Sequence, residues 1–168
     1  MVRTDKVIVC LSLLGTWQDG DAAAQWQPGK STILSVLISI QAMIFAEDPW
    51  RNQPGFASMV GEEADRKSRA YVKFVQPLTV RFAMLDWLQR DRLRHGIWSD
   101  VVRKHFSPNE KLILQNVDRW SQSNSAIRRW DGRADMGPRS GHHLFRSTTG
   151  IDLLQELRES LSQFRRNA

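Results

Sequence analysis

The chain contains a single cysteine, Cys10, within residues 9–17 (VCLSLLGTW). A lone thiol cannot form a disulfide within the chain, and it cannot supply a cysteine-rich zinc site. It acts either as a nucleophile or as a small buried apolar side chain, and free cysteines more often do the second. A single thiol is also typical of a reducing compartment. Cys10 is therefore the first candidate for chemistry, and its neighbours must decide between the two roles.

Two other motifs resemble known sites but lack essential parts. Residues 29–32 (GKST) imitate the end of a phosphate-binding loop, yet that pattern needs an earlier glycine where this chain has Ala24. His142 and His143 are adjacent, so regular secondary structure cannot direct both toward one ion, and no carboxylate or thiol lies at ligand spacing. The sequence therefore predicts neither a nucleotide, a metal nor another cofactor.

Composition places the chain among ordinary globular proteins. Of its 168 residues, 41% are apolar and 25% are charged, and the net charge is +6. The basic residues are dispersed, with the densest group between 128 and 139, so a solvated surface explains them better than nucleic-acid binding does.

The start of the chain lacks a clean signal-peptide pattern, and the longest apolar run, 33–46, is too short to span a bilayer. We expect a cytoplasmic or nuclear protein without a membrane partner.

Most elements that the sequence predicts are helices. Strand signals are confined to 6–14, where β-branched residues cluster, and 15–30 carries loop signals. The predicted fold class is α+β, predominantly helical, with three segments: a main domain over 1–122, a flexible connector over 123–150 and a C-terminal amphipathic helix over 151–168. Helices are expected at 32–46 (capped by Ser31 or Thr32), at 64–89 with a kink or break at Pro77, at 97–106, and at 108–122 with Ser107-Pro108 as its start.

The helix predicted at 32–46 has two distinct sides. One side carries large apolar residues at helical spacing, and the other carries a stripe with smaller side chains around one isoleucine. This stripe is either a docking face for a partner or one face of a helix that is packed on both sides. Its residues are Ser35, Ile38, Ser39 and Ala42.

Several segments of the chain together match a known pattern: 6–17, 26–28 (WQP), 33–41 and 47–56 (EDPWRNQPGF). They resemble the catalytic half of a ubiquitin-conjugating (UBC) domain. Among UBC proteins, the details after the predicted helix are similar to the branch of large hybrid conjugating enzyme/ligases typified by the giant inhibitor-of-apoptosis protein. The similarity extends more loosely through 104–106 (KHF) and 140–143 (SGHH) toward the final helix.

The resemblance implies a specific chemistry. In this family the cysteine receives ubiquitin from an activating enzyme as a thioester and passes it to a lysine of a protein substrate, and Cys10 matches that nucleophile. The face with Ser35, Ile38, Ser39 and Ala42 matches the one that holds the donor ubiquitin. Asn52 and Gln53 match the loop that flanks the thiol. Thiol exchange with an existing thioester is easy, so no neighbouring base is required.

One family element has no counterpart here. A His-Pro-Asn sequence usually precedes the cysteine by some ten residues, and 1–9 do not contain it. The sequence therefore predicts the C-terminal part of a UBC-like fold. Two alternatives stay open: an inactive fragment that binds ubiquitin or serves as a scaffold, and, with less support, a basic helical module that binds nucleic acid.

Overall fold

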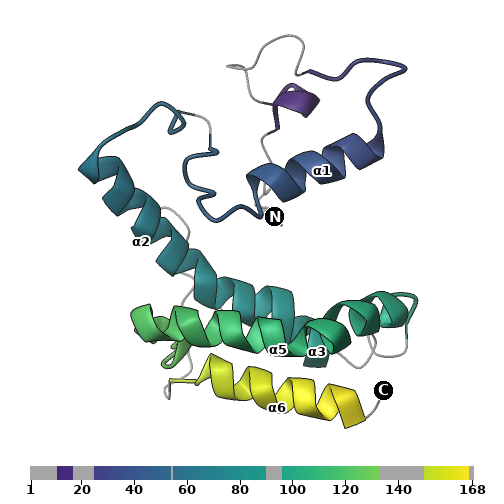
Figure 1. Cartoon of the computed structure of the whole chain (residues 1–168), viewed down its shortest axis with the longest axis vertical. Helices are drawn as coiled ribbons and strands as arrows, with labels where there is room; N and C mark the ends of the chain where they lie inside the picture. The colour runs from purple at the N-terminus through teal and green to yellow at the C-terminus, as the bar shows by residue number, and fades with distance from the viewer. Residues whose placement is uncertain (1–10, 17–24, 54, 90–95, 133–149, 167–168) are drawn as a thin grey trace, which may run out of the picture. The chain divides into compact units, whose positions relative to one another are not determined.

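A computed structural model describes residues 11–16, 25–53, 55–89, 96–132 and 150–166, and these residues are mostly helical (Figure 1). The chain divides into two compact units, Met1–Val72 and Lys73–Ala168.

Ser12–Leu14 forms a short 3₁₀ turn, η1, so the strand predicted over 6–14 is wrong at its end, and 6–10 lie outside the described residues. The described part contains no strand, so the α+β class is not confirmed. The domain boundaries predicted at 122 and 150 stay predictions.

In the first unit, helix α1 (Ile33–Met43) begins at a complete capping box. The Thr32 hydroxyl accepts a hydrogen bond from the Ser35 backbone N–H, and the Ser35 hydroxyl accepts one from the Thr32 backbone N–H, both at 3.2 Å. This arrangement satisfies two donors that a helix start leaves unpaired. The prediction of Thr32 as the cap is confirmed, although the helix ends three residues earlier than predicted.

The loop after α1 is held by a cluster of polar side chains around Arg51. Its guanidinium donates to the Asp48 carboxylate at 2.9 Å, to the Met59 carbonyl at 2.7 Å and to the Asp65 carboxylate. The buried Ser68 hydroxyl donates to the other oxygen of Asp48. These hydrogen bonds, chiefly those from Ser68 and then from Arg51, hold the pKa of the Asp48 carboxyl below its usual range, against an opposing effect of burial. We call these five residues the Arg51 cluster.

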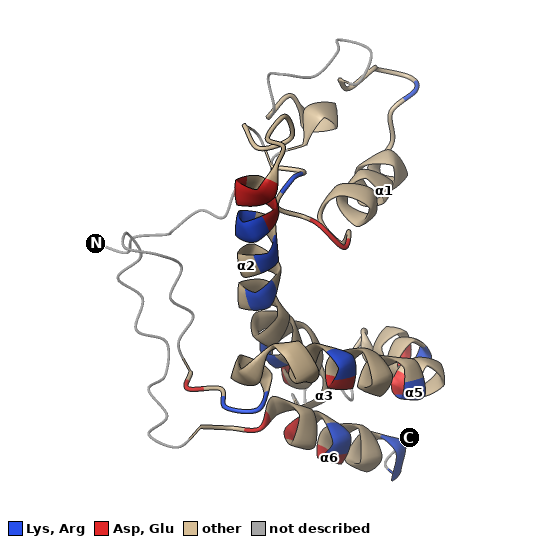
Figure 2. Cartoon of the chain, turned by 60° about the vertical axis from the view of Figure 1, so that its left-hand side comes forward, with Lys and Arg blue, Asp and Glu red and all other residues tan. Residues whose placement is uncertain are grey.

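Two of these side chains come from helix α2 (Glu62–Leu78), whose charge pattern suits its position. Its first turn carries Glu62, Glu63 and Asp65, and Lys and Arg follow farther along (Figure 2). Acidic side chains at a helix N-terminus interact favourably with the helix dipole. Asp65 therefore lies in the first turn of α2, where its carboxylate suits the helix dipole and also accepts from Arg51.

The second unit is built around one hydrophobic core. Helix α5 (Ser99–Ser123) packs against α6 (Leu153–Arg166), and α6 also packs against the π-helical segment η3 (Thr79–Leu85) and the short helix α3 (Asp86–Gln89). A 3₁₀ turn, η4 (Ser125–Ile127), follows α5. The buried core residues are Val80, Leu85, Leu88, Val102, Phe106, Val117, Ile127, Trp130, Leu153, Leu154, Leu157, Leu161 and Phe164.

The sequence predicts a kink or break at Pro77, and the helical chain does not break there, because a distant side chain supplies the missing donor. Proline has no N–H, so the Lys73 carbonyl, four residues earlier, loses its usual partner in α2. The buried side chain of Asn124 donates to this carbonyl at 2.7 Å and to the Gln76 side chain at 3.0 Å. The Thr79 hydroxyl similarly donates to the Val75 carbonyl where η3 begins. The helix therefore continues past the proline with a change of type instead of a break.

Helix α5 corrects a second prediction, since one helix replaces the two expected at 97–106 and 108–122. Pro108 lies inside it rather than at a helix start. Pro108 is exposed, so water can solvate the carbonyl that loses its partner. Beside it, the Asn109 side chain donates to the His105 carbonyl at 2.7 Å. On an exposed face, a proline is compatible with a continuous helix.

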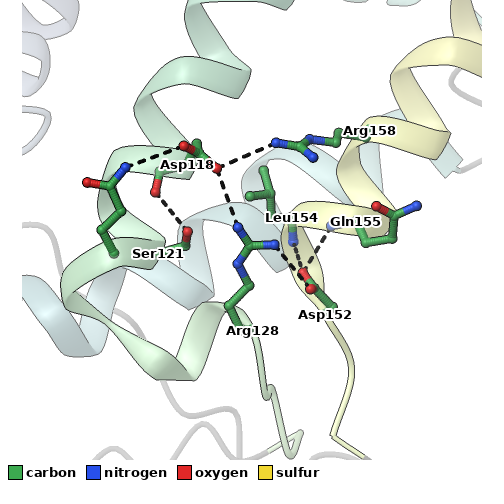
Figure 3. A network of polar contacts seen from close by, with 8 residues as sticks. Asp118, Ser121, Arg128, Asp152, Leu154, Gln155 and Arg158 are labelled. Carbon is green, nitrogen blue, oxygen red and sulfur yellow. Dashed lines mark hydrogen bonds and ion pairs between the residues drawn. The ribbon is translucent and has the colours of Figure 1, made fainter.

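The predicted C-terminal helix is present as α6, and Asp152 directly precedes its first residue. The Asp152 carboxylate accepts hydrogen bonds from the backbone N–H groups of Leu154 and Gln155, both at 3.0 Å. It also lies 3.3 Å from Arg128, which reaches Asp118 of α5 at 3.4 Å (Figure 3). Asp152 thus caps α6 and ties its start to the end of α5.

We expect Asn124→Ala to lower the free energy of unfolding by about 1–3 kcal/mol, because it leaves the Lys73 carbonyl without a donor. Pro77→Ala supplies a backbone N–H for that carbonyl, so the cost of Asn124→Ala should be smaller in a Pro77→Ala background. Urea denaturation of the four proteins measures both effects. Asn109→Ala is the matched control, because it removes an exposed bond of the same length and should change stability little. An equal cost in both backgrounds would contradict the role given to Asn124.

A second prediction concerns the Arg51 cluster. In Asp48→Asn we expect the amide protons of Gln53, Phe56 and Met59, which close turns in the loop, to exchange up to about fivefold faster at pH 7, since partly exposed charged contacts contribute about 1 kcal/mol or less. The folded state lowers the pKa of Asp48, so its contribution is full above the unfolded value of about 4 and is lost as the pH falls through the folded value.

Hydrogen exchange read by mass spectrometry, at neutral pH and below pH 4, tests this prediction. The two proteins should differ at neutral pH and converge at acidic pH. Glu63→Gln is the control, because it removes an exposed ion pair of α2 with Arg66 and should leave the three loop amides unchanged. A difference that persists at acidic pH would show that the Asp48 charge is not the cause.

Candidate functional site

Cys10 lies outside the described residues, and the turn that follows it is well defined. Leu11 is fully buried, and its backbone N–H donates to the Thr16 hydroxyl at 2.8 Å. The Thr16 hydroxyl in turn donates to the Leu11 carbonyl at 3.1 Å, and the Leu14 N–H donates to the same carbonyl at 3.1 Å. Gly15 closes the turn with φ of 66°, a conformation that glycine adopts without strain. The chain directly after the thiol is thus fixed by one buried side chain and a closed ring of hydrogen bonds.

The structure gives different roles to Asn52 and Gln53. The Asn52 side chain donates to the Met43 carbonyl at 2.9 Å and so satisfies a carbonyl at the C-terminal end of α1. Gln53 is half-buried, its backbone takes part in two turns of the loop, and its side chain makes no hydrogen bond to a described residue. Asn52 therefore contributes to the placement of the loop, whereas no described residue uses the Gln53 amide group. The proximity of either residue to the thiol stays a prediction.

On either side of these two residues in the sequence, the loop carries an aromatic residue, and the two rings stack. Trp50 is buried and packs against Phe56, with ring centroids 4.7 Å apart and planes inclined by 14°. Such stacked pairs add roughly 0.5–1.5 kcal/mol to the burial of the rings themselves. In the sequence, the two stacked residues stand before and after Gln53.

The proposed ubiquitin-facing stripe of α1 is accessible within the part of the chain that the structure describes. Ile38 is 55% exposed, Ala42 is exposed, and Ser35 and Ser39 are half-buried. Ser39 donates its hydroxyl to the Ser35 carbonyl at 2.9 Å, so its polar group is used within the helix. The opposite, large apolar side is also accessible; Leu34, for example, is 63% exposed. No residue of α1 is buried.

The Arg51 cluster is the part of this region that the sequence analysis missed. Asp48 and Arg51 are three residues apart and of opposite charge, which is a recognisable local signal. Ser68 lies twenty residues after Asp48, and no local pattern predicts that contact. The cluster links the loop that holds Gln53 to α2.

Two further observations concern the described residues. No three His, Cys, Asp or Glu side chains among them come together as ligands for a metal ion. Likewise, no helix in the described ranges is both long and apolar enough to cross a membrane.

Comparison with known proteins gives the family. No family model matches the chain. The probable ubiquitin-conjugating enzyme E2 R521 of Acanthamoeba polyphaga mimivirus is 35% identical over 114 residues, which are 67% of this chain and 8% of that protein. The probable ubiquitin-conjugating enzyme protein 17 of Caenorhabditis elegans is 34% identical over 113 residues, 67% of this chain and 15% of that protein. The human dual E2 ubiquitin-conjugating enzyme/E3 ubiquitin-protein ligase BIRC6 is 29% identical over 136 residues, 80% of this chain and 3% of that protein.

The matched region is thus a small part of each of these long relatives. All three carry the same activity in their names, and the third is of the hybrid type that the sequence resembles. By sequence, this chain belongs to the family of ubiquitin-conjugating enzymes.

Proposed function

We propose that the chain transfers ubiquitin, with Cys10 as the residue that carries it. The observation that supports this proposal most directly is the similarity to ubiquitin-conjugating enzymes. The one thiol of the chain lies in a segment that resembles the catalytic-cysteine region of this family. The thiolate of Cys10 attacks the thioester carbonyl of ubiquitin held by an activating enzyme, and that enzyme's thiol leaves. A lysine amine of a protein substrate then attacks the new thioester, an amide bond forms, and the Cys10 thiol is released.

The second step depends on position more than on a strong base. Attack by the amine creates a negatively charged oxygen, and hydrogen-bond donors directed at that oxygen lower the barrier. The Gln53 side chain has two N–H donors and no bond to a described residue, so it suits this role. The Asn52 side chain is already bonded to Met43, so we assign to it the placing of the loop. The stripe with Ile38 on α1 is accessible, as contact with the donor ubiquitin requires.

An inactive relative that binds ubiquitin through α1 is the second candidate. It is favoured by the exposure of apolar residues along the whole helix, because a surface of this kind binds partners whether or not the thiol reacts. Nucleic-acid binding has no comparable support, since the relatives are named for ubiquitin conjugation.

Incubation with activating enzyme, ATP and ubiquitin distinguishes the two candidates. On a non-reducing gel we expect an adduct that disappears with reducing agent and is absent in Cys10→Ala. In Cys10→Ser the adduct should persist under reducing conditions, because an oxygen ester replaces the thioester. Folded protein that binds ubiquitin without forming any adduct would favour the inactive relative.

The different roles of the two loop residues give a further prediction. Gln53→Ala should slow the discharge of charged protein onto free lysine by about tenfold or more while the thioester still forms, because a donor to the developing charge is lost. It should leave exchange of the loop amides nearly unchanged. Asn52→Ala should also slow discharge, but with faster exchange of the loop amides, since the Met43 carbonyl loses its partner. Discharge that is normal in Gln53→Ala would remove Gln53 from the site.

A further inference from the structure

A groove of about 560 Å³ runs along α5 and α6 in the unit Lys73–Ala168, and it contains none of the residues proposed for ubiquitin transfer. Part of its lining is apolar, from Pro108 and Leu114 of α5. The rest is mainly charged, with residues from both helices. A concave surface that combines an apolar wall with convergent charges is typical of sites that bind peptides.

The three basic residues of the groove have much of their binding capacity unused. Arg158 reaches Asp118 at 3.5 Å, as Figure 3 shows, and Arg165 reaches Glu110 at 3.9 Å with 72% of its side chain exposed. Both distances exceed those of good charge-assisted hydrogen bonds, which are about 2.7–2.9 Å. An arginine offers five N–H donors in a fork that fits a carboxylate. Lys111 makes no ion pair with a described residue. These cations can therefore bind added carboxylates.

The acidic residues of the groove are, by contrast, already neutralised. The Asp118 carboxylate lies within 3.5 Å of both Arg128 and Arg158, and Arg128 is also 3.3 Å from Asp152 (Figure 3). The charges of these two aspartates and two arginines add up to zero. Glu110 and Arg165 form a second neutral pair, so Lys111 leaves the groove with a net positive charge. The electrostatics thus favour an anionic ligand over a cationic one.

We propose that this groove docks an acidic peptide segment of a partner protein. Carboxylates of the segment bind Lys111, Arg158 and Arg165, and an apolar side chain between them packs on Pro108 and Leu114. This site is independent of thioester formation at Cys10. It gives the chain a means to select proteins by an acidic segment.

A fluorescein-labelled peptide in which Asp and Glu flank a central Leu-Phe pair tests the proposal by fluorescence anisotropy with the full chain. We expect saturable binding that weakens about tenfold or more in the double variant Lys111→Glu/Arg165→Glu. The matched control, Arg119→Glu/Arg166→Glu, changes the net charge equally on the same two helices outside the groove. It should weaken binding no more than about twofold, since separated exposed charges are screened by salt. Circular dichroism verifies that both variants are folded.

Three outcomes would overturn the proposal. The first is equal weakening by the two double variants, which indicates unspecific attraction to a basic protein. The second is equal binding of a peptide with Asn and Gln in place of the acids, or with Ser in place of Leu and Phe. The third is displacement by a single-stranded DNA oligonucleotide with the same dependence on Lys111 and Arg165, which makes the groove a nucleic-acid site. Thioester formation is measured separately, so failure here leaves the proposal for Cys10 unaffected.

Discussion

The Lys73 carbonyl needs a hydrogen-bond donor, and the way this need is met links the helices of the second unit. Pro77 deprives it of its helical donor, and a partly buried carbonyl that is left without a donor destabilises the folded state by about 1–3 kcal/mol. Asn124, fifty-one residues farther along the chain, meets this need, and its other side-chain atom accepts from the Ala126 N–H and so starts η4. That turn directs Ile127 into the core. One amide side chain thus joins the C-terminal part of α2 to the end of α5.

The first unit is organised on a different principle. Its loop is held by the Arg51 cluster and by the stacked rings of Trp50 and Phe56, whereas α1 contributes no buried side chain. The position of α1 also depends on directional bonds such as the one from Asn52 to Met43. The exposed apolar residues of this helix are accessible to a partner.

The sequence predicted those features whose causes are local. Thr32 and Ser35 form a cap within four residues, and the apolar spacing of α6 is visible in its own sequence. A break at Pro77 and a helix start at Pro108 do not occur, because the effect of a proline depends on what surrounds the orphaned carbonyl: a distant asparagine in one case and solvent in the other. A short stretch of sequence around either proline does not show what will surround that carbonyl in the fold.

The same distinction separates the two amides of the candidate site. Asn52 and Gln53 are neighbours of similar chemistry, so the sequence assigns them one role. The fold distinguishes them, because the Met43 carbonyl at the end of α1 takes a donor from Asn52, whereas the Gln53 side chain makes no hydrogen bond to a described residue. A group that must meet a short-lived charge has to be held in place and still have unused donors. Of the two amides, the one of Gln53 has donors that no described residue uses, which is why the proposed mechanism assigns the developing charge to it.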